Sequence, residues 1–253
     1  MIGRIHSQAY VTTMILGGLL LSFRPSTWVY PVRNRLARQI LFAGVEAIPF
    51  TLLVAALMGG IVFSQCLNWL QVTGEVDLIG RMVGRLLIRI VAPFLSTFLV
   101  VGASASAITT ELATMKTSGE VKLLEAQGVN LFQYLVVPRM VGLAICVLGL
   151  SLIFACVSIL SSGVGFIFFG GDVRDPAPFF RTVFETLEGT DFLSLALLTT
   201  VPGLVMGALC CYEGLRVGGA STEVPQAVSR AILRSISATV LVTALVLVFT
   251  YYG

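Results

Sequence analysis

Side chains that could carry out acid–base or metal chemistry are scarce in this chain. Among 253 residues there is one histidine, His6, and there are only two lysines, Lys116 and Lys122. A histidine-based triad or metal site therefore has almost nothing to be built from. The five cysteines lie mostly within apolar runs and show no C-x-x-C spacing, which favours buried small side chains over a zinc site or a disulfide framework.

The usual catalytic and nucleotide-binding motifs are also missing from the sequence. Neither lysine follows a glycine-rich turn, so there is no G-x-x-x-x-G-K-S/T loop to cradle nucleotide phosphates. No G-x-S-x-G elbow and no H-E-x-x-H pair occurs. We therefore expect no catalytic residue, no metal and no cofactor in this chain. The net charge of +3 is too small to indicate a nucleic-acid partner.

The composition points to a membrane protein. Apolar residues make up 57% of the chain and charged residues 11%, and the mean hydropathy is +0.95. A soluble domain is about half apolar and about one quarter charged. A helix needs roughly 20 apolar residues to cross the hydrocarbon. Five runs qualify: 40–63, 90–110, 140–171, 192–212 and 235–253. The expected fold class is an all-α integral membrane protein with five transmembrane helices.

The N-terminal region does not meet the length criterion for a span. The apolar run 10–23 is too short to cross and is followed by Arg24 and Pro25. We interpret it as a helix lying in the membrane interface, followed by a basic helix over 27–38. A true first span remains the alternative. The expected organisation is residues 1–39 as N-terminal interfacial helices and residues 40–253 as the transmembrane domain.

The distribution of positive charge predicts the orientation. With five spans, the N-terminus and the loops 111–139 and 213–234 share one side, and they hold most of the 16 lysines and arginines. The positive-inside rule places that side in the cytoplasm and the C-terminus outside. Arg81, Arg85 and Arg89 recur every four residues, so they should form one basic stripe on a helix leading into the second span.

The loop between the second and third spans carries the clearest local signal. Ser118 or Thr117 could cap a helix, Glu120 suits its first turn, and Gly128 supplies a left-handed stop. These signals predict a short cytoplasmic helix over about 117–128, with Val121, Leu124 and Leu123 as an apolar face. Such a helix could transmit force from a soluble partner into the spans. On pattern alone a solvated connector is an equal reading.

At this loop the chain resembles the MlaE permease family, the membrane subunit of ATP-binding-cassette transporters that move phospholipids together with MCE proteins. The residues of the loop that match the family pattern are Glu111, Met115, Lys116, Ser118, Leu124, Gly128 and Val129. The run that follows matches through Tyr134, Leu135, Val136, Val137, Pro138 and Arg139. Further matches are Gln65, Arg89, Pro93, Gly218, Gly219, Ala220 and the stretch 228–232. The resemblance covers about residues 40–250.

The chain departs from the family pattern at several polar positions. The family has a glutamate after the arginine where this chain has Ile90. It has an arginine in the stretch that here contains Ser104. Its Glu-Gln at the start of the loop helix corresponds to Gly119-Glu120, and its Asp-Pro to Asn130-Leu131. The resemblance therefore does not carry over ion pairs within the spans.

The resemblance implies a homodimer in the bacterial inner membrane, with the N-terminus cytoplasmic and the C-terminus periplasmic. Each copy would bind a cytoplasmic ATPase subunit, which holds the ATP and magnesium, and a periplasmic MCE protein would sit on the outer face. The residues implied in ATPase contact are Glu111, Met115, Lys116, Ser118, Glu120, Lys122, Leu124, Glu125 and Gly128. The residues implied in an outward-opening phospholipid pocket are Leu57, Ile61, Phe63, Gln65 and Arg89.

Two other functions stay open on the sequence. One is a membrane scaffold that anchors a periplasmic assembly without transport. The other is an ion-coupled carrier that uses Glu46, the single acidic residue within the five runs. The sequence shows neither which lipid is transported nor the direction of transport.

Overall fold

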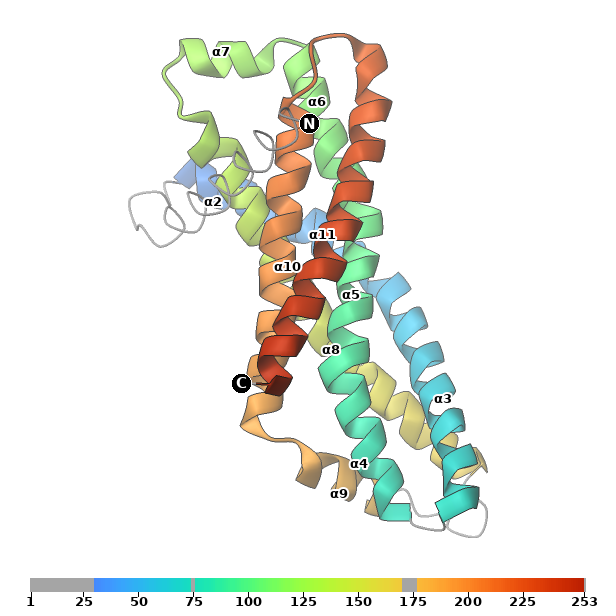
Figure 1. Cartoon of the computed structure of the whole chain (residues 1–253). Coiled ribbons are helices and arrows are strands. Elements are labelled where there is room, and N and C mark those ends of the chain that lie inside the picture. Colours follow the sequence, from blue (N-terminus) through green and yellow to red (C-terminus); the bar gives the residue numbers. More distant parts are fainter. Residues whose placement is uncertain (1–29, 74–75, 170–176, 253) are drawn as a thin grey trace. The chain divides into compact units, whose positions relative to one another are not determined.

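The computed structural model describes residues 30–73, 76–169 and 177–252, and these residues form helices without any strand (Figure 1). The α-helices are α2 (Tyr30–Ile40), α3 (Ile48–Thr73), α4 (Val76–Leu86), α5 (Ala92–Val100), α6 (Ser106–Thr117), α7 (Glu120–Ala126), α8 (Val137–Phe169), α9 (Ala177–Thr186), α10 (Gly189–Leu215) and α11 (Val224–Tyr252). The run 10–23 lies outside the described residues. The all-helical fold class is confirmed.

Five helical segments in the described residues are long and apolar enough to cross a membrane, as the sequence predicts. They span Arg33–Gln65, Gly80–Thr117, Phe132–Gly165, Gly189–Leu215 and Ser221–Phe249. Most of them extend beyond the expected apolar runs into charged sequence. The last begins about four turns before residue 235, so Arg230 and Arg234 lie within it.

The run 140–171 is longer than one straight span needs, which favours either tilt or a break near Ser161 and Ser162. The helix is not broken there, because α8 is continuous from Val137 to Phe169. Both serine hydroxyls reach carbonyls of the neighbouring helix, and Ser162 Oγ also lies 2.8 Å from the carbonyl of Ser158 on its own helix. Ser161 Oγ donates to the carbonyl of Ala56 at 2.6 Å, and Ser162 Oγ donates to that of Gly59 at 2.9 Å. Serine in an apolar helix can satisfy its hydroxyl on backbone carbonyls in this way.

In the part of the chain that the structure describes, four five-residue π-helical turns interrupt the helices: Leu41–Val45, Leu87–Val91, Val101–Ala105 and Phe132–Val136. Two of them, Leu87–Val91 and Phe132–Val136, end two residues before a proline. Ala92 N–H donates to Leu87 C=O just before Pro93, and Val137 N–H donates to Phe132 C=O just before Pro138. Because proline lacks an N–H, the hydrogen-bond ladder is disturbed there and a wider turn can be accommodated.

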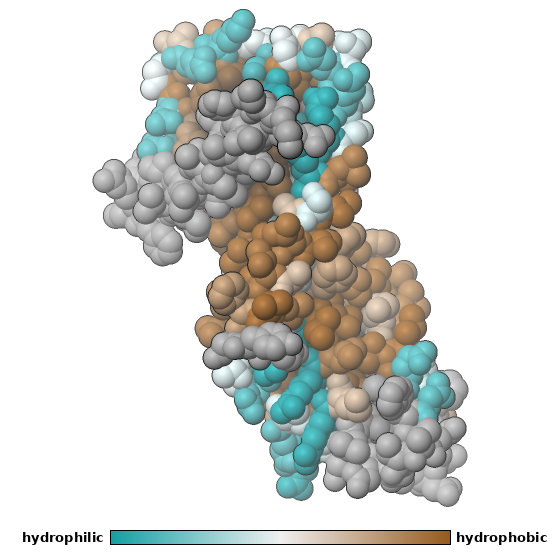
Figure 2. All heavy atoms as spheres, viewed as in Figure 1, coloured by the Kyte–Doolittle hydropathy of each residue, from teal (hydrophilic) through white to brown (hydrophobic). Residues whose placement is uncertain are grey.

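The chain forms two compact units. Among the described residues, the first contains 30–46, 97–147 and 200–252, and includes α2, α6, α7 and α11. Here glycines on α10 let helices approach closely, because a Cβ at Gly207 would lie 2.7 Å from Met140 Cα and one at Gly214 would lie 2.8 Å from Leu112 Cβ. In this unit hydrophilic side chains gather at the end where α6 meets α7, and hydrophobic side chains cover the surface beyond it (Figure 2).

The second unit contains residues 47–96 and 148–199 and includes α3, α4 and α9. Glycines again mark the helix crossings: a Cβ at Gly80 would lie 2.9 Å from Thr182 Cβ, where α4 packs against α9. Phe63 is buried and meets Phe179 edge to face, with ring centroids 6.3 Å apart. Small residues at crossings are the usual basis of helix association in lipid.

Candidate functional site

The short helix α7 lies between the second and third spans, as predicted. It runs from Glu120 to Ala126, and Gly128 follows it with φ +74°. Gly128 N–H donates to Glu125 C=O at 3.0 Å, and Val129 N–H donates to Leu124 C=O at 3.1 Å. This pair of bonds is the Schellman motif, which needs a left-handed residue and therefore favours glycine. The predicted stop at Gly128 is confirmed.

The predicted cap of α7 is wrong. Ser118 closes α6 instead, because its hydroxyl donates to the carbonyls of Thr114 and Met115 at 2.9 and 3.2 Å. The residue before α7 is Gly119 with φ +81°, and no side chain caps the helix. The left-handed glycine turns the chain sharply between α6 and α7, so the two helices follow each other at a corner (Figure 1).

The end of α6 is tied into its unit by polar side chains. Lys116 Nζ donates to the carbonyl of Leu215 at the end of α10. Glu111 forms an ion pair with Arg139 on α8, with its Oε1 2.8 Å from Nη2, and Arg35 Nη1 of α2 lies 3.7 Å from the same oxygen. Thus Glu111 and Lys116 hold the base of α7, and they are not part of its outward surface.

The outward surface of α7 consists of the exposed side chains of Glu120, Lys122, Leu123 and Glu125. Val121 is buried, and Leu124, like Met115 on α6, is half-buried. Leu123 is 63% exposed, so it does not belong to the apolar face that the sequence suggested. Two acidic groups, one basic group and one large apolar side chain therefore face outward together.

A buried carboxylate in the same unit was missed by the sequence analysis. Glu213, near the end of α10, has no exposed surface and is paired with Arg234 and, at 3.3 Å, with Arg230. Both arginines lie on α11 and are four residues apart, so they share one face of that helix. The four-residue spacing of the arginines was the available signal, but the last span was expected to begin only at residue 235.

The residues predicted for the lipid pocket lie in the second unit, on different faces. Leu57 and Ile61 are exposed on α3, with Gln65 one turn further on. Phe63 is buried against Phe179, as described above. Arg89 is 24% exposed and forms an ion pair with Asp191 of α10, which is 1% exposed. The structure thus supplies a carboxylate partner for Arg89 from another helix, although Ile90 replaces the glutamate of the family pattern.

The described polar groups of each unit form ion pairs within that unit. Within the described residues no group of three or more histidine, cysteine, aspartate or glutamate side chains could hold a metal ion. The carboxylates Glu111, Asp191 and Glu213 are each engaged by an arginine. Helices that span a membrane and a short surface helix between two of them define a multi-pass membrane protein.

Comparison with known proteins identifies the family. The model of the permease MlaE family matches residues 36–249, so the chain belongs to the MlaE permease family. It is similar to the probable ABC transporter permease protein RP096 of Rickettsia prowazekii, with 26% identity over 78% of this chain and 76% of the relative. It is also similar to the probable ABC transporter permease protein ycf63 of Pyropia yezoensis, with 26% identity over 85% of this chain and 80% of the relative. The probable ABC transporter permease protein slr1045 of Synechocystis sp. is 25% identical over 81% of this chain and 78% of the relative.

Proposed function

We propose that this chain is the permease subunit of an ATP-driven phospholipid transporter, in which a separate cytoplasmic ATPase subunit works through α7. The observation that carries the proposal is the geometry of α7. Its outward side chains are free to meet a partner, while the end of α6 beside it is fixed to α8 and α10 by Glu111 and Lys116. A displacement of α7 would therefore be transmitted to the three spans that contain α6, α8 and α10.

A charge-reversal experiment tests the ATPase contact. The triple variant Glu120→Lys, Lys122→Glu, Glu125→Lys changes only exposed side chains of α7. Because like charges placed opposite each other disfavour an interface, we expect the ATPase subunit to be lost on co-purification. The matched control reverses three exposed charges of the second unit, with Arg81→Glu, Arg85→Glu and Glu185→Lys, and should retain the ATPase. Retention in the α7 variant would contradict the proposal.

The lipid pocket is proposed on α3, opening toward the outer face between two copies of the chain. The exposed Leu57 and Ile61 offer an apolar wall for acyl chains, and the buried Phe63 supports that helix from behind. Gln65 and Arg89 lie nearer the proposed mouth. Purification in mild detergent, followed by mass measurement of the assembly and lipid mass spectrometry, tests the dimer, the periplasmic MCE partner and the bound phospholipid together. A monomer without lipid would count against all three.

In the proposed transporter, the partner subunit hydrolyses ATP and this chain does not. The purified chain without that subunit should show no ATPase activity above the rate of an empty-vector preparation. Added ATPase subunit should restore hydrolysis in the assembly. Hydrolysis by the permease chain alone would contradict this assignment.

A further inference from the structure

A large cavity lies within the first unit. Its volume is about 1230 Å³, and its wall is formed by α2, the π-helical turn after it, α6 and the start of α8. The residues that the argument uses are Arg35, Arg38, Gln39, Phe42, Val45 and Arg139. All of the lining residues belong to one compact unit.

One part of the cavity wall is cationic. Glu111 is already engaged by Arg139 at 2.8 Å, so that pair is close to neutral. Arg35 lies further from the same carboxylate, at 3.7 Å, and its guanidinium stacks over the Tyr134 ring at 5.0 Å. Arg38 lines the cavity and forms no ion pair with any carboxylate in the described part of the chain. A positive charge is thus left over on this wall.

Two buried hydrogen-bond donors in the wall lack protein acceptors. Gln39 is 8% exposed and Arg139 is 4% exposed, and both line the cavity. Gln39 Nε2 and Arg139 Nε have no hydrogen-bond partner among the described residues. A buried donor without an acceptor is costly, so it favours a ligand rich in acceptor oxygens. Arginine in particular suits a phosphate group.

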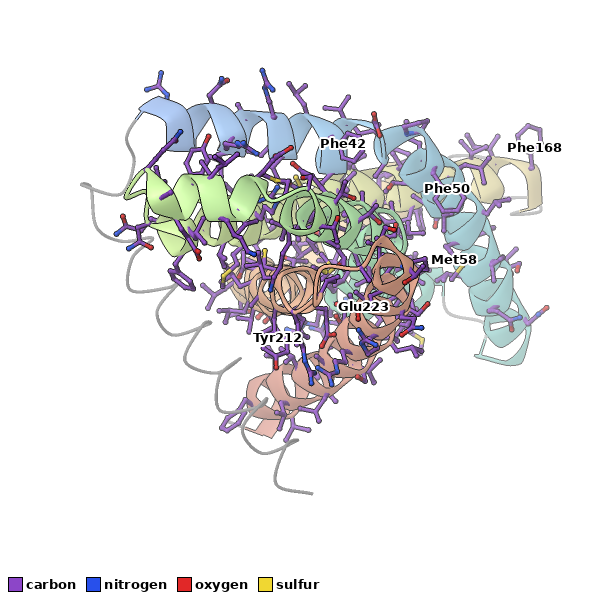
Figure 3. All side chains as sticks on the ribbon, turned by 90° about the horizontal axis from the view of Figure 1, so that it is seen from above. Phe42, Phe50, Met58, Phe168, Tyr212 and Glu223 are labelled. Atoms are coloured by element: carbon purple, nitrogen blue, oxygen red, sulfur yellow. The ribbon has the colours of Figure 1, made fainter. Side chains whose placement is uncertain are left out.

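The wall becomes apolar along the chain beyond Arg38. Leu41, Phe42 and Val45 line the cavity and are 60%, 53% and 50% exposed. Phe42 lies on the segment that follows α2, which runs beside α8 within this unit (Figure 3). Glu46 also lines the cavity, but it lies about two helical turns beyond Arg38. A cationic end followed by an exposed apolar strip matches a molecule with a phosphate head and hydrocarbon tails.

We propose that this cavity binds a phospholipid from the membrane leaflet on the α7 side. Arg35 and Arg38 hold its phosphate, with Gln39 and Arg139 as further donors, and its acyl chains lie along Phe42 and Val45. The assignment of this leaflet to the cytoplasmic side rests on the proposed function. The binding of a phospholipid in the cavity does not depend on it. A bound lipid here would link α2 to α6 and α8 next to the base of α7.

The test uses the full chain in phosphatidylcholine nanodiscs that contain a trace of a phosphatidylglycerol with a photoactivatable group near its head. In the wild type, cross-links should map to residues 34–46 and 134–139. Loss of two charge-assisted hydrogen bonds in the variant Arg35→Gln, Arg38→Gln should lower the cross-link yield at these peptides by roughly tenfold. The matched control Arg81→Gln, Arg85→Gln removes two exposed arginines from α4 and should leave the yield unchanged.

A second variant separates a lipid from a free phosphate ion. Phe42→Ser, Val45→Ser changes only the exposed apolar strip, so it should also lower the yield if acyl chains bind there. An unchanged yield in the arginine variant, or cross-links that avoid both peptides, would overturn the proposal. Loss of the cross-links on adding inorganic phosphate, with no effect of the serine variant, would assign the cavity to a free anion and equally overturn it. No ATPase subunit is present, so failure here is distinguishable from failure of the proposed function.

Discussion

Arg234 on α11 is paired with Glu213 on α10, a carboxylate that has no exposed surface. Arg230, one turn earlier on α11, lies 3.3 Å from the other oxygen of the same carboxylate. One buried negative charge therefore holds two partly exposed positive charges and joins the last two spans.

The variant Glu213→Gln tests this pairing. Removing the buried charge leaves two arginines without their carboxylate, so the free energy of unfolding should fall by about 3 kcal/mol. Thermal unfolding of the protein in detergent, followed by tryptophan fluorescence or circular dichroism, measures the loss.

The control for that variant is Glu185→Gln, which removes the same charge from an exposed i,i+4 pair with Arg181. Solvent screens such a pair, so its loss should hardly change the unfolding temperature. Equal losses of stability in the two variants would show that the burial of Glu213 does not make its pairing more stabilising than an exposed pair.

The ion pair of Arg89 with Asp191 should show strong energetic coupling. Asp191 is 1% exposed and also accepts from the backbone N–H of Glu188 at 3.0 Å. Arg89→Met leaves that buried carboxylate without its cation, so it should destabilise the fold more than the double variant Arg89→Met, Asp191→Asn does. A double-mutant cycle on unfolding free energies should give a coupling of about 2 kcal/mol. Additive effects would show that the two side chains act independently.

Neighbouring glycines on α3 provide a test of helix packing with its own control. A Cβ at Gly59 would overlap the Ser158 carbonyl group of α8, whose carbon would lie 2.9 Å away, whereas a Cβ at Gly60 would meet nothing within 4 Å. Gly59→Ala should therefore lower the free energy of unfolding by about 2 kcal/mol. Gly60→Ala should leave it unchanged or raise it slightly, because alanine has the higher helix propensity. Comparable losses in both variants would contradict the close crossing at Gly59.

The sequence was sufficient for the number of spans and the place of α7, because both depend on local patterns. Long apolar runs identify membrane helices, and a glycine after two helical turns identifies a stop such as Gly128. The ends of the spans could not be obtained in this way. Apolar runs stop at the first charge, whereas the helices continue past Glu213 and begin before Arg230, since buried pairing makes those charges tolerable within a helix.

The polar partners were beyond sequence reasoning for a different reason. Arg89 and Asp191 are separated by 102 positions, and no local pattern links them. Likewise Ser118 could cap either α6 or α7 by its residue type alone, and only the left-handed backbone of Gly119 decides between the two helices. Glycines in the spans also differ in effect, since Gly59 lies at a crossing and Gly60 and Gly102 do not, and residue type alone does not distinguish them.

The proposed orientation predicts which face of the membrane each surface segment occupies. Gln127, just after α7, and Glu185, on α9, are both exposed, and in the sequence they precede and follow the third span. In whole cells with a permeable outer membrane, a cysteine at Glu185 should react with a membrane-impermeant thiol reagent, and one at Gln127 should react only after lysis. The unsubstituted chain gives the background from its native cysteines. Reaction of the Gln127→Cys variant in intact cells would place α7 outside and remove its access to an ATPase.

The last prediction separates an ATP-driven permease from an ion-coupled carrier. Glu46 is exposed at the turn between the π-helical segment Leu41–Val45 and α3, and it takes part in no ion pair among the described residues. A proton-coupling carboxylate needs a partner and a protected position to change its protonation during transport. Glu46→Gln should therefore leave lipid transfer in reconstituted vesicles within about twofold of the wild type, and collapse of the proton gradient should have no effect while ATP is present. Loss of transfer in this variant, together with sensitivity to the gradient, would favour the carrier.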